Sequence, residues 1–191
     1  MRYRSISYDK LAPIWVIIII NLLIFIATLV SRNLIYLLGL QAATFLEQPW
    51  TIITSMFTHA GISHILFNML TLYFYGSFLC QLIGNKNLLI IYFGGGILGG
   101  IFFLLLAPPY VTGIGASGAV FALGGALAIL TPRLRVYVFP IPVPMPLWAA
   151  VIGGFFILSI VPGIAWQAHL GGLVFGLIAG YFHRRRARLL F

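Results

Sequence analysis

Four polar side chains stand inside long apolar stretches of this chain and are of types that do chemistry together. Ser117 follows a glycine-rich segment, and His169 lies near the start of another apolar stretch. A serine hydroxyl becomes a nucleophile when an imidazole takes its proton, and the oxyanion that its attack creates needs hydrogen-bond donors. His64 and Asn68 are four residues apart, so they share a helix face and could supply those donors.

Carboxylates are almost missing from the chain. Its only two acids are Asp9, near the beginning, and Glu47, in a mixed polar segment. A nucleophile–base pair here would therefore be a dyad without an acidic third member, and paired-aspartate chemistry is excluded. There is no H-E-x-x-H motif, and the single cysteine, Cys80, cannot form a metal cluster or an internal disulfide. We expect no metal and no cofactor.

The composition indicates a lipid environment. Hydrophobic residues make up 62% of the 191 residues and charged residues only 7%, whereas a soluble domain carries about a quarter charged residues. Eleven Lys and Arg against two acids give a net charge of +9. These cations lie in the breaks between the apolar stretches, a pattern typical of membrane topology, so we expect no nucleic acid partner. The predicted partner of the surface is the lipid bilayer.

Six apolar stretches predict an all-α membrane protein, a six-helix bundle formed by one domain over residues 1–191. A helix needs about 20 residues to cross about 30 Å of hydrocarbon, and Gly, Pro and Asn mark the breaks between the stretches. Alternating prolines predict an extended connector at Pro140–Pro146, and Ser31–Ala60 is expected to form a structured external loop. The predicted spans are 11–30, 61–82, 88–107, 117–131, 146–161 and 165–182.

The cations segregate to one side of this predicted topology. With both termini in the cytoplasm, ten of the eleven Lys and Arg are cytoplasmic and only Arg32 is external, as the positive-inside rule requires. We therefore predict a multi-pass protein of the cell membrane. The second, fourth and sixth spans then begin outside, so the four polar residues lie at similar depth toward the external face. The fourth span of 15 residues is about 22 Å long, which puts Ser117 about 8 Å below the outer surface.

Small residues provide a way to bring two of these spans together. Gly172, Gly176 and Gly180 recur at every fourth position after His169, and small side chains at this spacing let helix backbones approach closely. The fourth span offers Gly118, Ala122 and Gly125 in return. A close crossing would place the Ser117 hydroxyl within hydrogen-bonding reach of the imidazole. Because Ser117 begins its helix, its backbone N–H also points toward any negative charge that develops there.

Three motifs resemble those of the rhomboid family of intramembrane serine proteases, in order and with similar spacing over about residues 50 to 181. They are FTHAGISHILFN at 57–68, GASG at 115–118, and AHLGGLVFG at 168–176. The resemblance implies a six-span core, with Ser117 as nucleophile and His169 as base. It further implies that His64 and Asn68 assist the oxyanion, and that the substrates are transmembrane segments of other proteins, cut near their outer ends.

Further roles and two departures follow from the same resemblance. Phe121 matches an aromatic residue that stacks on the catalytic imidazole, so it supports the site together with Gly115 of the serine motif. Phe67 matches a residue of the lateral gate for substrate, and the fifth span is expected to open. Family members often carry Trp-Arg in the first loop, where this chain has Trp50-Thr51. Cys80 stands where a glutamate is common.

Two alternatives from other classes remain open. A rhomboid-like protein without activity would bind or escort membrane helices; such a protein is expected to lack the serine or the histidine, and both are present. A transporter would show inverted repeats with broken helices, and no internal repeat is seen. His59 falls about 140° from His64 on a helix, so it is expected to brace the first loop. The substrate, its preferred cleavage site, the oligomeric state and the organism are not encoded in any of these patterns.

Overall fold

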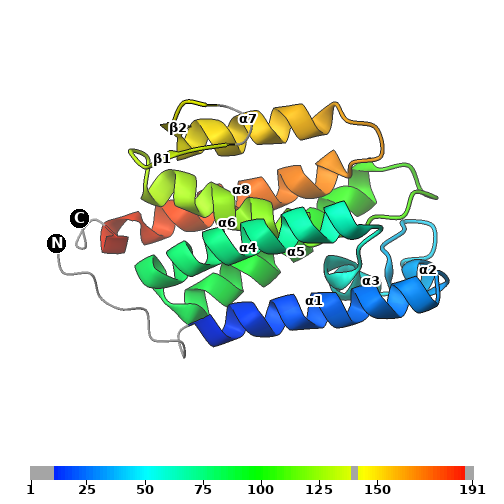
Figure 1. The fold of residues 1–191 in the computed structure, drawn as a ribbon. Coiled ribbons are helices and arrows are strands. Elements are labelled where there is room, and N and C mark those ends of the chain that lie inside the picture. Colours follow the sequence, from blue (N-terminus) through cyan, green and yellow to red (C-terminus); the bar gives the residue numbers. More distant parts are fainter. Residues whose placement is uncertain (1–10, 139–141, 188–191) are drawn as a thin grey trace.

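Helices lying side by side make up most of the structure (Figure 1). The computed structural model describes residues 11–138 and 142–187. In chain order the elements are α1 (Ala12–Val30), α2 (Leu34–Leu38), α3 (Thr51–Thr54), the 3-10 helix η2 (Ser55–Phe57), α4 (Ile62–Ile83), α5 (Asn85–Leu106), α6 (Ser117–Leu130), β1 (Arg135–Val136), β2 (Met145–Pro146), α7 (Leu147–Ser159) and α8 (Trp166–Ala187).

Among the described residues, three helices are long and apolar enough to cross a membrane. They are α1, α4 and α5, while α6 and α7 are apolar but shorter, with 14 and 13 residues. The outward faces carry large exposed apolar side chains such as Leu23, Leu66 and Ile157. An apolar exterior of this kind is stable against lipid and not against water. The chain therefore folds as a helical membrane protein.

Each of the six predicted stretches contains one helix, but some bounds differ. Gly84 has a φ of 82° and joins α4 directly to α5, so α5 begins at Asn85 and not at residue 88. Only glycine adopts such a turn without strain. α7 ends two residues before the predicted bound, and α8 continues to Ala187, beyond the predicted residue 182, because the basic segment contains no helix breaker.

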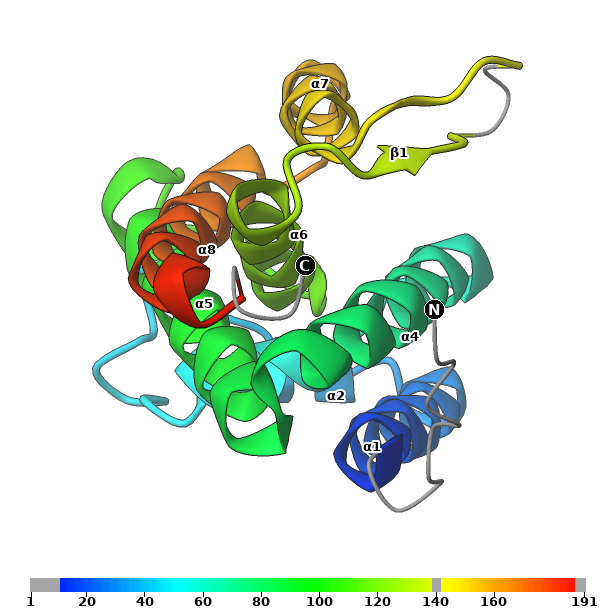
Figure 2. The ribbon, with the colours of Figure 1, turned by 90° about the vertical axis from the view of Figure 1, so that its left-hand side faces the viewer.

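The central element is α6, which Figure 2 shows enclosed by its neighbours. Eleven of its 14 residues are buried, and most of them are Gly, Ala or Leu. Its small side chains let the surrounding helices approach closely, since close packing in membranes depends on small contact residues. The end of the bundle at which α6 begins is also the end at which the predicted site residues lie.

The segment between α1 and α4 forms a compact cap at that end. Leu40 and Gly113 exchange two backbone hydrogen bonds of 2.8 and 2.9 Å, and the Gln41 side chain donates to the Thr112 hydroxyl at 2.7 Å. Trp50 Nε1 donates to the Leu37 carbonyl at 3.1 Å. The cap is thus tied to the segment that leads into α6, as the predicted structured loop requires.

An extended arm joins α6 to α7. β1 and β2 pair antiparallel, with Arg135 opposite Pro146 and Val136 opposite Met145. The proline-rich stretch that was expected to be extended is non-helical over residues 142–146, and its remainder lies outside the described residues. Figure 2 shows the arm projecting from the bundle beside α7.

Candidate active site

Ser117 and His169 meet across two helices. Ser117 is the first residue of α6, and His169 lies in the first turn of α8, which begins at Trp166. The hydroxyl oxygen of Ser117 lies 2.8 Å from Nε2 of His169, a hydrogen bond of ordinary length. The His169 side chain is only 4% exposed. The hydroxyl can therefore pass its proton directly to the imidazole.

Close backbone contact between α6 and α8 brings the Ser117 hydroxyl within 2.8 Å of the His169 imidazole. A Cβ added at Gly172 would collide with the carbonyl of Gly118, and one at Gly176 with the carbonyl of Ala122. A Cβ at Gly180 would lie 2.8 Å from the carbonyl oxygen of Ala126. The close crossing predicted from the glycine spacing is confirmed.

The His169 ring is held from one side by Phe121. The two rings are stacked with their centroids 4.6 Å apart and their planes 29° apart. Nδ1 of His169 has no hydrogen-bond partner among the described residues. Within residues 11–138 and 142–187 the only carboxylate belongs to Glu47, in the cap segment before α3. The imidazole is therefore oriented by ring packing where a triad would use a carboxylate.

His64 faces Ser117 across Gly115. The amide of Ala60 approaches Nδ1 of His64 at 3.5 Å, which favours the tautomer that carries its hydrogen on Nε2. A Cβ built at Gly115 would lie 2.6 Å from that Nε2 and 3.7 Å from the Ser117 hydroxyl. Gly115 has a φ of 120°, a conformation that side chains rarely adopt. The space between the imidazole N–H and the hydroxyl is thus open because residue 115 is glycine.

Asn68 lies one helical turn after His64 and is 7% exposed. One N–H of its amide donates to the His64 carbonyl at 2.8 Å, which leaves a second N–H for another acceptor. Asn68 also lines a cavity of about 200 Å³ that Ser117 shares. The predicted pair on α4 therefore lies at the same end of the bundle as Ser117 and His169.

His59 has a closer relation to the site than its sequence position indicated. It precedes α4, so the 140° helical separation from His64 does not apply, and the two rings pack edge to face at 4.9 Å. Nε2 of the fully buried His59 accepts the N–H of Ala116 at 3.4 Å. Burial lowers the pKa of His59 to about 3, and His64 adds to the shift while the Phe57 backbone opposes it. His59 thus braces the turn before Ser117 as a neutral acceptor.

The cavity beside Ser117 lies between α4, α6 and α7. Its lining is mostly apolar, and the polar atoms at its wall come from few side chains. The residues that line it are Phe67, Asn68, Thr71 and Tyr75 of α4, Ser117, Val120, Phe121 and Gly124 of α6, and Ala150, Val151, Gly154 and Leu158 of α7. A side chain or an unwound backbone segment could reach the hydroxyl through this space.

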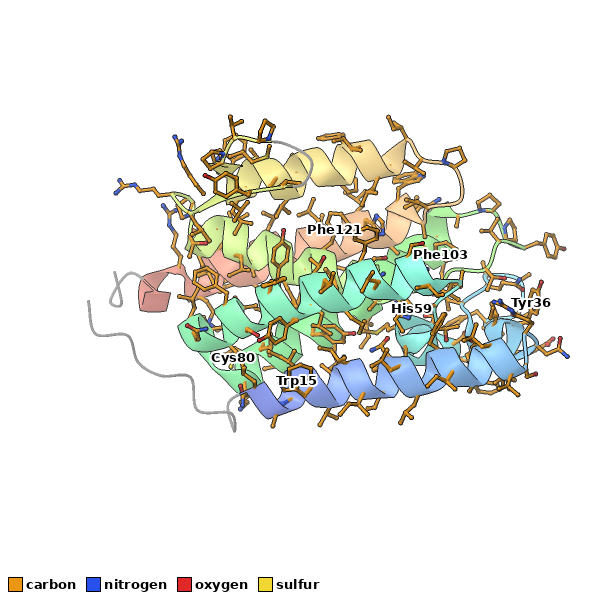
Figure 3. The ribbon with its side chains drawn as sticks, in the orientation of Figure 1. Trp15, Tyr36, His59, Cys80, Phe103 and Phe121 are labelled. Atoms are coloured by element: carbon orange, nitrogen blue, oxygen red, sulfur yellow. The ribbon has the colours of Figure 1, made fainter. Side chains whose placement is uncertain are left out.

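Potential metal ligands do not cluster in the described part of the chain. No three His, Cys, Asp or Glu side chains come together there in an arrangement that would hold an ion. Figure 3 shows His59 and Phe121 well away from Cys80, which lies toward the other end of the helices. Cys80 Sγ lies 2.6 Å from Oδ1 of Asn85, so the residue found in place of the family's glutamate connects α4 to the first turn of α5.

The fold and the site define a class: a helical membrane protein with a serine and a histidine joined at the ends of two closely crossing helices. Residues 46–186 match the family model described as the Rhomboid domain, so the chain belongs to the rhomboid family.

Named relatives match long parts of the chain. It is 36% identical over 153 residues to RHOMBOID-like protein 12, mitochondrial, of Arabidopsis thaliana, which covers 68% of this chain and 45% of that protein. It is 30% identical over 184 residues to Rhomboid protein 1, mitochondrial, of Saccharomyces cerevisiae. This match covers 79% of this chain and 53% of that protein. It is also 30% identical over 131 residues to Rhomboid protease GluP of Bacillus subtilis. This match covers 68% of this chain and 25% of that protein. The match thus spans about half or less of these relatives' own length.

Proposed function

We propose that the chain is an intramembrane serine endopeptidase that uses Ser117 and His169 as a dyad. The observation that carries this proposal is the 2.8 Å hydrogen bond between the Ser117 hydroxyl and Nε2 of His169, inside a helical membrane fold. Membership of a family that includes a protein named rhomboid protease supports it.

The chemistry follows from the atoms that meet. His169 takes the hydroxyl proton through Nε2 as Ser117 attacks a peptide carbonyl, and the same nitrogen then gives that proton to the departing amine. Water, activated by the same imidazole, releases the acyl group from Ser117. The stacked Phe121 keeps the ring in position during both steps.

The oxyanion would be bound beside Gly115. The proposed donors are Nε2–H of His64, which borders that space, the second amide N–H of Asn68, and the backbone N–H of Ser117 at the start of α6. Gly115 supports the site because any side chain there would meet the His64 ring. These side chains contact the developing charge, so their removal should lower kcat more than it raises KM.

We propose transmembrane segments of other proteins as substrates. Ser117 lines the mostly apolar cavity between α4, α6 and α7. A substrate helix would be unwound near its outer end, since a peptide bond inside a regular helix does not expose its carbonyl carbon to the hydroxyl. Separation of α7 from Phe67 and its neighbours on α4 would admit it.

We also propose a six-span topology for a single domain over residues 1–191. α1, α4 and α5 have the length of spans, and α6, α7 and α8 complete the count with shorter or partly charged helices. The end that carries β1 faces the cytoplasm, and Ser117 lies toward the external face, following the distribution of cations. The cell-membrane location stays a prediction, since two relatives named above are mitochondrial.

The test uses purified protein in detergent with several model transmembrane substrates. Wild type should cleave at least one of them, and Ser117→Ala and His169→Ala should abolish cleavage. A fluorophosphonate probe should label Ser117, as read by mass spectrometry, and should fail to label the His169→Ala protein. Full cleavage by either variant would rule out the dyad. Binding of substrates without cleavage by wild type would favour an escort function.

A further inference from the structure

Exposed cations gather at the end of the bundle opposite the candidate site. Four cations are all exposed there, in the first turn of α5, near the end of α8 and on the arm between α6 and α7: Lys86, Arg184, Arg133 and Arg135. Within the part of the chain that the structure describes, the only carboxylate is that of Glu47, in the cap at the other end. Among these residues, the cations at this end therefore have no acidic side chain to neutralise them.

The arm presents two of these cations on an extended backbone. Arg133 and Arg135 are two residues apart, and Arg135 opens β1, which pairs with β2 over only two residues. Pro142, Pro144 and Pro146 have no N–H, so the sheet cannot be extended on that strand. Open sheet edges are excluded from hydrocarbon because their polar groups need partners. The arm must therefore lie outside the hydrocarbon region of the bilayer.

Aromatic and aliphatic side chains accompany the arginines on the arm. Tyr137 is 74% exposed, Val143 60% and Trp148 50%. Tyr and Trp accumulate at the membrane interface, where a ring contacts acyl chains and its polar atom reaches water. A guanidinium pairs well with phosphate because its donors are arranged as a fork. Arginines beside interfacial aromatics have the composition of a phospholipid headgroup site.

The base of the arm is joined to α7, a wall of the substrate cavity. The N–H of Leu147 donates to the carbonyl of Leu134 at 2.8 Å, so the first turn of α7 is fixed to the arm beside Arg133 and Arg135. Elsewhere α7 contacts the bundle through few buried side chains, namely Val151 and Phe155, and its Gly153 and Gly154 face open space. A ligand that held the arm would hold the start of α7.

We propose that the described part of the arm, residues 133–138 and 142–146, binds an anionic phospholipid of the bilayer together with the first turn of α7. Arg133 and Arg135 contact its phosphate, and Tyr137 and Trp148 lie beside its acyl chains. The bound lipid fixes the first turn of α7 at the membrane surface. It thereby limits how far α7 moves from α4. The lipid site does not depend on the proposed proteolysis, but this effect on substrate entry does.

Lipid binding is measured first, without any activity. Detergent-solubilised wild type is titrated with phosphatidylglycerol or phosphatidylcholine, and bound lipid is counted by native mass spectrometry. We expect wild type to prefer phosphatidylglycerol, and Arg133→Gln with Arg135→Gln to weaken that binding at least about five-fold, the effect of one cation near an anionic surface. Both side chains are exposed, so the double variant should fold as wild type does.

The matched control is Lys86→Gln with Arg184→Gln, which removes the same charge from the same end but leaves the arm intact. This control should keep the wild-type preference, and millimolar inorganic phosphate should not displace the lipid. If both double variants lose the same affinity for phosphatidylglycerol, the cations act only through their summed electrostatic field, and the arm is not a lipid-binding site. If the arm variant binds phosphatidylglycerol like wild type, the proposal is wrong. Displacement by free phosphate would likewise overturn the lipid assignment.

Proteolysis in liposomes then tests the link to α7. With phosphatidylglycerol in the bilayer, the arm variant should show a KM for a transmembrane substrate changed at least about three-fold, while the control variant matches wild type. An unchanged KM with weakened lipid binding would disprove the effect on α7. If wild type cleaves nothing, the proposed function fails, and the mass-spectrometric result still decides the lipid site.

Discussion

At the scale of single residues, the candidate site depends on what is absent as much as on what is present. No side chain stands at residue 115, no carboxylate lies within hydrogen-bond distance of His169 among the described residues, and the space between His64 and Ser117 stays open. Motif spacing in the sequence pointed to Ser117 and His169, and their hydroxyl and imidazole lie 2.8 Å apart. Their catalytic roles remain proposals to be tested.

Gly115 offers a sharp test at this scale. In Gly115→Ala the new methyl group would lie 2.6 Å from Nε2 of His64, at a φ of 120°, so it would fill the place of the oxyanion. We expect kcat for a transmembrane substrate to fall at least about 100-fold, the usual effect of losing one oxyanion donor, with little change in KM. Initial rates are measured over a range of substrate concentrations and normalised to folded protein.

The control for this variant is Gly84→Ala. Gly84 also has a positive φ, of 82°, but no atom lies within 4 Å of its added Cβ. Alanine there costs about 1–2 kcal/mol in backbone strain and touches no site residue, so its kcat should stay within about three-fold of wild type. If wild type and Gly115→Ala cleave at equal rates, the space beside Gly115 does not bind the oxyanion.

His59 makes a prediction about acid stability. Its pKa is lowered to about 3 in the folded state, mainly by burial, and is about 6.5 when unfolded. Below pH 6.5 the unfolded chain therefore binds a proton that the folded chain does not. The free energy of unfolding should fall as the pH drops from 6.5 toward 3, by at most about 1.4 kcal/mol per pH unit from this group.

His59→Gln isolates that contribution. Glutamine can still accept the Ala116 N–H but does not titrate, so the variant should lose less stability between pH 6.5 and pH 4 than wild type does. Thermal unfolding in detergent across this pH range measures the difference. Parallel pH dependences for the two proteins would show that His59 is protonated in the folded state as readily as in the unfolded state.

At the scale of elements, the periodic features were predictable and the loop contacts were not. A helix lies in each of the six predicted apolar stretches, and the small residues at every fourth position of α8 correctly predicted its close crossing with α6. The predicted 140° separation of His59 from His64 is wrong, because His59 precedes the first residue of α4 and is not part of that helix. The contacts of Leu40 with Gly113 join segments about 70 residues apart, and no local pattern encodes such a pairing.

Other hydrogen bonds stabilise the cap of this chain, which has Thr51 after Trp50 where family members often have an arginine. Thr51 Oγ1 donates to the Gln48 carbonyl at 2.6 Å, and Thr54 Oγ1 donates to the Leu38 carbonyl at 2.7 Å. Short local hydrogen bonds thus hold α3 to the rest of the cap. The sequence shows that Thr51 replaces the arginine common in the family, but it does not show which carbonyl accepts the hydrogen bond of the threonine hydroxyl.

The α6–α8 crossing is tested by adding one methyl group. In Gly172→Ala the Cβ would collide with the Gly118 carbonyl, so the helices must separate. We expect the free energy of unfolding to fall by about 1–3 kcal/mol, the usual cost of overpacking, and cleavage to fall because Ser117 and His169 move apart. Gly153→Ala on α7, where no atom lies within 4 Å, should change stability by no more than about 1 kcal/mol. Equal effects of the two changes would contradict the close crossing.

At the scale of the whole molecule, the charge distribution and the candidate site mark opposite ends of one bundle. The cap, the turn before Ser117 and the start of α8 lie at one end, and the arm lies at the other with Lys86, Arg133, Arg135 and Arg184 (Figure 1). Among the described residues, three helices are both long and apolar enough to cross a membrane. The proposed six-span topology adds α6, α7 and α8, and it places Ser117 below the surface because α6 has only 14 residues.

Accessibility of single cysteines decides that topology. In a Cys80→Ser background, cysteines replace Leu46 and Tyr110, which are 93% and 83% exposed at the cap end, and Tyr137, which is 74% exposed on the arm. The protein is reconstituted in vesicles of known orientation and treated with a membrane-impermeant maleimide. Cysteines at 46 and 110 should react from one side of the membrane and the cysteine at 137 only from the other.

A cysteine at Phe67 serves as the internal reference. The Phe67 side chain is 68% exposed on the protein surface but lies within α4, so in a bilayer it faces lipid or the substrate cavity and should react only after detergent is added. Reaction of residues 110 and 137 from the same side would mean that α6 does not cross the membrane. Ser117 would then have no preferred external face, because the two ends of its helix would share one aqueous compartment.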